Sequence, residues 1–259
     1  MKRTLDKATV IGLVLGLAAI FGSFLWEGGK MAGLLLPAAM LIVFAGTFAA
    51  ALIGTSMQAF LNIGTLTRLA LFPPRFAVRE DIGTIVRFST IARKDGLLAL
   101  ERELGSLDNK FMQKILRLAI DGTEPETLRH LAETEVNYVT ERHAQGAALF
   151  QKMGGYSPTM GIIGTVMGLI ATLSNAGEDP DTLIRSIAGA FVATLWGVFM
   201  ANLVWLPIAD KLKYIHNEEY FYMDMIVEGI LAIQAGEVPS VIKAKLNSML
   251  PASDQEQDD

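Results

Sequence analysis

Four long stretches of this sequence contain no charged residue. They are residues 8–26, 31–67, 153–177 and 186–209, which hold 19, 37, 25 and 24 residues in turn. A helix needs about 20 apolar residues to cross the hydrocarbon core of a bilayer. The sequence therefore predicts four membrane-spanning helices, near residues 8–26, 31–54, 153–175 and 187–207.

The composition agrees with a membrane protein. The chain of 259 residues is 51% hydrophobic, which is high for a soluble domain, and all 49 of its Lys, Arg, Asp and Glu residues (22 basic and 27 acidic) lie outside the four predicted spans. The first span has no small-residue cleavage pattern after it and a second span follows closely, so we interpret it as an uncleaved anchor rather than a signal peptide. The absence of cysteine excludes disulfides and thiolate chemistry.

Basic residues predict the orientation in the membrane. Lys and Arg flank the outer ends of each span pair, at positions 2, 3, 7, 68, 75, 142, 152, 211 and 213. The two short loops, residues 26–31 and 175–185, contain only Lys30 and Arg185 as basic residues. Since positive charge is retained on the cytoplasmic side, both termini and the middle region are predicted to be cytoplasmic.

The parts outside the spans show helical spacing of apolar residues and no alternation typical of strands. Short amphipathic helices are predicted between Arg79 and Ala119, with breaks near Gly96 and Gly105, after the prolines of Phe72–Arg75 end the extension of the second span. One long helix should lead into the third span, and the fourth should continue past Pro207 to Gly236, with a last short helix after Pro239. The predicted fold is an all-α polytopic membrane protein. Its segments are residues 1–55 (spans one and two), 56–150 (cytoplasmic helical domain), 151–210 (spans three and four) and 211–259 (cytoplasmic helices and a solvated acidic tail).

The third and fourth spans each carry a stripe of small and hydroxyl residues. The third has Pro158, Gly161, Thr165, Gly168 and Thr172 at steps of three and four, and the fourth has Ala190, Thr194, Gly197 and Ala201 in the same rhythm. Such stripes are typical of helix-packing seams, because small residues allow close approach and hydroxyls bond across the contact. The spacing alone therefore favours a packing seam, and the alternative is that these hydroxyls supply oxygen ligands to a small hard cation.

The depth of two threonines favours the second interpretation. Thr165 lies 13 residues from Lys152 and Thr194 lies 16 residues from Asp210, which places them within about 5 Å of the same depth. No Asp or Glu lies in any predicted span, although ion paths usually include one. If these hydroxyls line an ion path, the acid must come from a partner.

Other chemistry finds no support in the sequence. There is no phosphate-binding loop, serine-hydrolase motif or zinc motif, and His130, His143 and His216 have no metal-ligand spacing. The diffuse net charge of −5 gives no sign of nucleic-acid binding. We therefore expect no enzyme, no cofactor and no metal beyond a transient cation.

Several ordered segments resemble one family, the A subunits of bacterial flagellar stators (the MotA/PomA family), which is related to TolQ and ExbB. These segments are ARKDGLLALE at residues 92–101, YSPTMGIIGTVMG at 156–168, ATLWG at 193–197, LPIADKL at 206–212 and GEVPSVI at 236–242. The resemblance covers nearly the whole chain. It implies a multi-pass protein of the bacterial inner membrane that couples cation flow to torque on the flagellar rotor, and so serves motility and chemotaxis.

The resemblance also implies partners and residue roles. Five A subunits would surround the single transmembrane helices of two B subunits, each with an essential Asp, and the ring would act on the rotor switch protein FliG. The implied ion path includes Thr165, Thr194, Pro158 and Gly161, and Pro158 and Pro207 are implied in conformational coupling. The implied rotor-binding residues are Arg93, Lys94 and Glu101.

The resemblance favours Na⁺ over H⁺ as the transported ion. Sodium-driven members such as PomA carry threonine at the position of Thr165, where proton-driven members usually carry alanine, although PomA has paired threonines where this chain has Ala193-Thr194. Two alternatives stay open at the level of sequence. One is a related five-subunit motor that energises another envelope process, like ExbB or TolQ, or gliding; the other is a permease or scaffold whose seams only pack helices.

Overall fold

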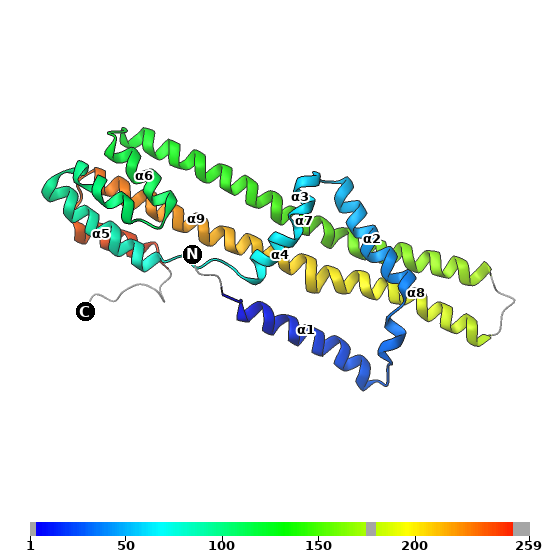
Figure 1. Ribbon diagram of the computed structural model, residues 1–259. Coiled ribbons are helices and arrows are strands. Elements are labelled where there is room, and N and C mark those ends of the chain that lie inside the picture. Colours follow the sequence, from blue (N-terminus) through cyan, green and yellow to red (C-terminus); the bar gives the residue numbers. More distant parts are fainter. Residues whose placement is uncertain (1–3, 175–179, 251–259) are drawn as a thin grey trace. The chain divides into compact units, whose positions relative to one another are not determined.

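The computed structural model describes residues 4–174 and 180–250. All the regular secondary structure in those residues is helical (Figure 1). Three helices are long and apolar enough to cross a membrane: α1 (Lys7–Trp26), α7 (Pro125–Ser174) and a continuous run over Thr182–Gln234. That run joins α8 (Pro180–Met200), the π-helix η3 (Ala201–Trp205) and α9 (Leu206–Gln234). A further apolar helix, α2 (Pro37–Ile53), has 17 residues, at the short end of what spans a bilayer. The predicted all-α membrane fold is confirmed, and the count of four spans stays a prediction.

The chain divides into two compact units. The membrane unit comprises residues 4–74 and 143–215, and the polar unit comprises residues 75–142 and 216–250. The acidic end of the chain, residues 251–259, and the first part of the loop predicted after the third span, residues 175–179, lie outside the described residues. Helix α8 begins at Pro180, so the second half of the predicted loop, up to Arg185, is helical.

The second predicted span begins later than the sequence indicated. A short 3₁₀ helix, η1 (Met31–Leu34), stops before Pro37, and Pro37 then occupies the first turn of α2. Proline suits a first helical turn, where its missing amide has no partner to lose, but it cannot continue a helix from the preceding turn. The indole of Trp196 bonds to the chain at this interruption, where its Nε1–H donates to the Leu34 carbonyl at 2.8 Å.

The exit from α2 is also broken. The helix ends at Gly54, and two short helices follow, α3 (Met57–Leu61) and α4 (Ile63–Leu71). Ser56 begins α3 as its N-cap, because its Oγ accepts a hydrogen bond from the Ala59 amide at 3.2 Å. The prolines after Phe72 therefore end α4 and not a direct extension of the second span.

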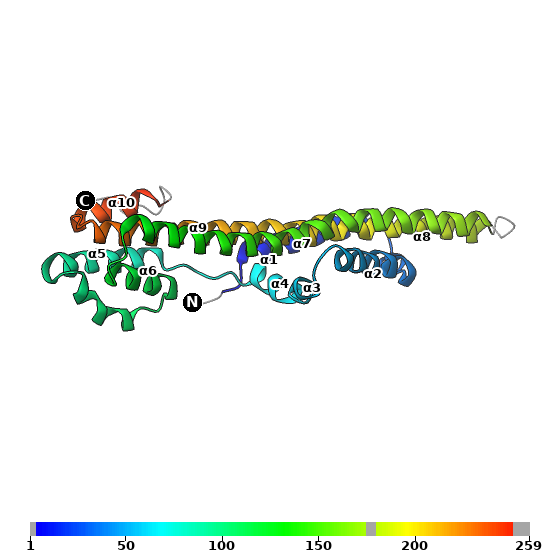
Figure 2. The ribbon, with the colours of Figure 1, turned by 90° about the horizontal axis from the view of Figure 1, so that it is seen from above.

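Within the membrane unit, α7 and α8 run side by side and α2 packs against α8 (Figures 1 and 2). Helix α1 has no buried residue, and its last residue, Trp26, is 93% exposed. Its contacts include Gly16 against the Leu203 side chain and the Phe21 ring, which packs 5.4 Å from that of Phe199. A tryptophan at the end of a span is typical of the membrane–water boundary.

The polar unit packs α5 (Val78–Asp95), the 3₁₀ helix η2 (Leu97–Ser106), α6 (Lys110–Ile120) and α10 (Pro239–Ser248) with residues 125–142 of α7 and 216–234 of α9. Its core contains fully buried side chains from most of these elements, including Ile85, Leu100, Met112, Leu128 and Ile230. The predicted break at Gly96 is confirmed by its φ of 82°, a left-handed conformation that favours glycine. The predicted helix end at Gly236 is confirmed in the same way, with φ of 72°.

Two polar clusters join the helices of the polar unit. Asn109 caps α6 and donates Nδ2–H to the Tyr222 hydroxyl at 2.8 Å, and that hydroxyl donates to Asp81 on α5. Glu228 on α9 pairs with Arg129 on α7 at 2.6 Å and with Lys245 on α10 at 2.8 Å. Burial alone would raise the pKa of Glu228, but the hydrogen bonds from Lys245 and Arg129 outweigh it and lower that pKa. Glu228 is therefore held as a carboxylate that fastens three helices.

Asp6 fastens the start of α1 to the membrane unit. Its carboxylate accepts from the Thr9 amide at 3.1 Å as the N-cap and pairs with Lys211 Nζ at 2.8 Å. The hydrogen bond from Lys211, followed by that from Thr9, lowers the pKa of Asp6 from 3.8 to about 2. A carboxyl group with a lowered folded pKa adds stability above its unfolded pKa and loses it as the pH falls toward the folded value.

We therefore expect the thermal midpoint of the detergent-solubilised protein to fall as the pH drops from 4 toward about 2, with part of that fall absent in Asp6→Asn. Asn retains the cap but not the charge, so Asp6→Ala should cost about 1 kcal/mol more than Asp6→Asn at pH 7. Identical acid profiles for wild type and Asp6→Asn would contradict the ion-pair assignment.

Candidate ion-coordination site

The structure brings Thr165 of α7 and Thr194 of α8 together, as their matched depth predicts. Their Oγ1 atoms lie 2.6 Å apart. Thr165 Oγ1 also lies 3.0 Å from the Gly161 carbonyl oxygen and 2.9 Å from the Ala190 carbonyl oxygen. We call these four oxygen atoms the threonine cluster. The two hydroxyls supply two protons to four oxygen atoms, so the cluster presents lone pairs in excess of its donors.

Glycine permits this approach of the two helices. A Cβ atom at Gly161 would lie 2.8 Å from the Ala193 carbonyl oxygen and 3.0 Å from Thr194 Cα. A Cβ atom at Gly197 would lie 2.6 Å from the Ser157 carbonyl oxygen and 3.2 Å from Pro158 Cα. These obstacles are backbone atoms that cannot rotate away. The seam predicted from the small residues is therefore a true backbone-to-backbone contact, and it sets the spacing of the two hydroxyls.

Both predicted coupling prolines interrupt the backbone bonding of their helices. Pro158 lies inside α7 and leaves the Gly154 carbonyl without its usual donor. Near Pro207 the Leu206 amide bonds to the Ala201 carbonyl in η3 rather than to that of Asn202. A π-helical turn of this kind is rare and is found often at functional sites. Because Pro207 has no amide, the Leu203 carbonyl also loses its usual donor.

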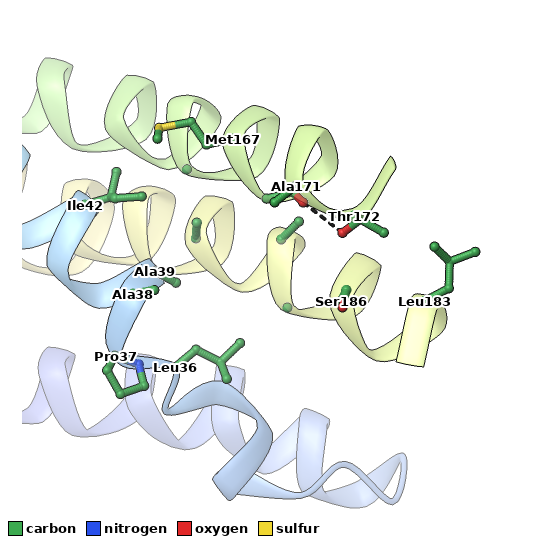
Figure 3. A pocket seen from close by; sticks show the side chains of 15 residues that line it. Leu36, Pro37, Ala38, Ala39, Ile42, Met167, Ala171, Thr172, Leu183 and Ser186 are labelled. Carbon is green, nitrogen blue, oxygen red and sulfur yellow. Dashed lines mark hydrogen bonds between the residues drawn. The ribbon is translucent and has the colours of Figure 1, made fainter. Parts of the chain in front are cut away.

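A cleft of about 470 Å³ opens beside the threonine cluster, between the start of α2, α7 and α8 (Figure 3). Ala190 and Ala193 line it, and their backbone carbonyls also face the threonine cluster and Gly161. Its other walls are mostly alkyl, with hydroxyls from Thr172 and Ser186, and Thr172 donates its own to the Gly168 carbonyl at 2.8 Å. The cleft offers little to a hydrated cation, so the oxygens able to hold one are those of the threonine cluster.

The predicted rotor-binding residues belong to the polar unit. Arg93 and Lys94 stand exposed in the last turn of α5, and Glu101 is exposed on η2, beyond the turn at Gly96. An ion pair of 3.1 Å between Arg87 and Glu103 ties η2 to α5. The three charges therefore stand on one supported segment and face solvent.

Sequence reasoning missed the contribution of Ala190. Its carbonyl oxygen belongs to the threonine cluster, but an alanine in a sequence indicates only packing. The one sequence feature that could have identified it is its position four residues before Thr194. No group of three or more His, Asp or Glu side chains able to hold a metal occurs among residues 4–174 and 180–250. Four oxygens and no carboxylate form an incomplete shell for a dehydrated cation.

Long apolar helices with proline breaks and a half-buried oxygen cluster are features of an α-helical membrane protein. The chain belongs to the MotA/TolQ/ExbB proton channel family, whose family model matches residues 103–225. The model of the Motility protein A N-terminal region matches residues 10–94. The resemblance read from the sequence is thus confirmed.

Relatives match over almost the full chain. Motility protein A of Bacillus subtilis is 37% identical over 97% of this chain and 93% of its own length, and chemotaxis protein PomA of Vibrio alginolyticus is 34% identical over 95% and 96%. Among solved structures, the C. jejuni MotAB structure superposes with a TM-score of 0.93 at 28% identity, covering 98% of this chain and all of that one. The Bacillus subtilis flagellar MotAB stator complex superposes with a TM-score of 0.91 at 36% identity, over 96% and 98%.

The close contact at Gly197 yields a prediction. Gly197→Ala should destabilise the membrane unit by about 1–3 kcal/mol, because the new methyl group meets backbone atoms of α7. Gly12→Ala is the matched control, since nothing lies within 4 Å of its Cβ position on α1. Thermal midpoints in detergent should fall for the first variant and stay level or rise for the second. Equal midpoints would refute the contact.

Proposed function

We propose that this chain is the A subunit of a flagellar stator, which conducts a cation through the cytoplasmic membrane and converts its flow into torque on the rotor. One observation carries the proposal: a half-buried oxygen cluster at the contact of two apolar helices, in a chain whose predicted spans contain no acid. Full-length likeness to two MotAB structures supports it. The match of the Motility protein A N-terminal model to residues 10–94 favours the motility branch over the TolQ and ExbB branch.

In this proposal the missing carboxylate belongs to a B-type subunit. Its single transmembrane helix would bring an Asp to the threonine cluster of Thr165 and Thr194, within a ring of five A subunits around two B subunits. A unit charge crossing the membrane releases about 2.3 kcal/mol per 100 mV, so several ions are needed for each large rearrangement. Pro158 and Pro207, with their open carbonyls, are the positions where α7 and α9 would bend.

We infer that Na⁺ is the transported cation. It requires several oxygen ligands, and the two threonine hydroxyls and two carbonyls supply a partial set that a proton would not need. In functional terms residues 1–55 and 151–210 would lie in the bacterial inner membrane, and residues 56–150 and 211–259 would face the cytoplasm. FliG would contact Arg93, Lys94 and Glu101.

The first test concerns the ion site. The chain is expressed with its B partner in a motile host that lacks its own stator, and swimming speed is measured against Na⁺ at a fixed proton-motive force. We expect speed to rise with Na⁺, and Thr165→Val and Thr194→Val to abolish swimming or shift the Na⁺ dependence at least about tenfold, since each removes a ligand oxygen.

Thr172→Val is the matched control, because Thr172 lies two turns along the same stripe and donates to the Gly168 carbonyl of its own helix rather than to the threonine cluster. Swimming that is independent of Na⁺ in the wild type would overturn the sodium assignment but not the stator function. Valine variants at 165 and 194 that swim like the control would overturn the threonine site.

The second test concerns the rotor contact. Charge reversals Arg93→Glu and Glu101→Lys should reduce torque strongly while the purified complex keeps its size and thermal midpoint, because these side chains are exposed. Lys114→Glu is the control reversal; it removes an exposed ion pair with Glu135 that contributes little stability. Loss of the complex would instead make Arg93 and Glu101 structural, and normal torque would remove them from the rotor surface.

A further inference from the structure

Three buried polar atoms of the membrane unit have no hydrogen-bond partner within the described chain. They are Thr47 Oγ1 on α2, Ser157 Oγ on α7 and Trp205 Nε1 in η3, on residues that are 1%, 0% and 7% exposed. Other hydroxyls here, such as that of Thr172, donate to the carbonyl four residues earlier. Any Ser or Thr in a helix can donate its hydroxyl to that carbonyl. Thr47 and Ser157 do not, so their hydroxyls are free to bind another group.

Contacts of their neighbours connect the three residues within the membrane unit. On α2, Thr47 stands between Val43, which belongs to the same core cluster as Ala193, and Ala51, which belongs to the cluster of Met153 and Trp205. Its neighbour Gly46 lies against Met160, one helical turn from Ser157 on α7. The Trp205 ring packs 5.8 Å from that of Phe48, the residue after Thr47.

The proline breaks lie close in the chain to two of these residues, Ser157 and Trp205. Pro158 follows Ser157 directly, and the Cβ position of Gly154, whose carbonyl Pro158 leaves open, lies 2.5 Å from the side chain of Leu206. Leu206 precedes Pro207, where the carbonyls of Asn202 and Leu203 lose their usual donors. Two hydroxyls, one indole N–H and several open carbonyls therefore share this region.

We propose that Thr47, Ser157 and Trp205, together with these carbonyls, hold ordered water in a buried hydration site. Water is the one small ligand that donates and accepts, as this mixed set requires, and buried water usually makes about three hydrogen bonds to such groups. Inside a bilayer no bulk water reaches open backbone groups, so proline breaks depend on side chains and ordered water. The site is separate from the threonine cluster, where Thr165 and Thr194 already bond to each other.

Isosteric removal of one hydroxyl gives a test of sign. A buried hydroxyl with no hydrogen-bond partner destabilises the folded protein. If the site is dry, Thr47→Val should therefore raise the thermal midpoint of the full chain, measured in detergent in the assembly in which it purifies. If the hydroxyl binds water, Thr47→Val lowers the midpoint by about 2–4 °C. The double variant with Ser157→Ala should lose less than the sum of the two losses, because both side chains share bound water. A midpoint that rises or stays unchanged in Thr47→Val would overturn the proposal.

Single cysteines provide a second readout, which also decides the matter if the valine variant does not fold. The chain has no native cysteine, so Thr47→Cys and Ser157→Cys report without background. Val43→Cys and Ala51→Cys are the controls, since both positions are 0% exposed and lie one turn to either side of Thr47. A thiolate forms in a hydrated site and is suppressed in a dry one, so the first pair should react with a small water-soluble thiol reagent at least about tenfold faster. Equal rates at all four positions would refute the hydration site.

Discussion

The contact between α7 and α8 at Gly161 and Gly197 governs the arrangement of the membrane unit. Lipid tails are as apolar as leucine, so helices in a bilayer are held by close packing and hydrogen bonds rather than by escape from water. With no Cβ at these two glycines, backbone meets backbone, and Thr165 and Thr194 come within 2.6 Å of each other. Pro158 lies in the same contact, so the weakest turn of α7 stands where the helices are closest.

This arrangement separates the ligands from the charge. Hydroxyls and carbonyls can be buried at small cost when they bond to one another, whereas an Asp at the centre of a spanning helix costs about 2.5–3.5 kcal/mol on insertion scales. A chain with oxygen ligands and no intramembrane acid can therefore insert and fold before it meets the group that completes its site. In the proposed stator the acid arrives on the partner's helix, so conduction waits for assembly.

Periodicity and depth were enough to predict much of this structure. Uncharged length predicted the long helices, Gly96 and Gly236 predicted two breaks, and counting from Lys152 and Asp210 predicted the meeting of Thr165 with Thr194. These features depend on spacing along one helix or on distance from the membrane surface, and a sequence contains both.

What sequence could not supply depends on which backbone atoms face each other. The Ala190 carbonyl is part of every residue's backbone and has no signature of its own, and a threonine at position 47 looks like any packing hydroxyl until its neighbours are known. The interruption before Pro37 was missed because apolar length alone counts residues and ignores where a helix must restart.

The three tryptophans of the chain stand in three different surroundings. Trp26 projects from the end of α1 at 93% exposure, Trp196 donates its indole N–H to the Leu34 carbonyl, and Trp205 is buried among aromatic rings. The emission maximum of an indole depends on the polarity around the ring. Each of the three tryptophans should therefore have its own emission wavelength and its own accessibility to quenchers. The protein thus contains native fluorescent reporters at the end of α1, at the contact of α8 with the junction before α2, and on the π-helical turn. Replacing any two of them with phenylalanine leaves the emission of the third to be followed alone.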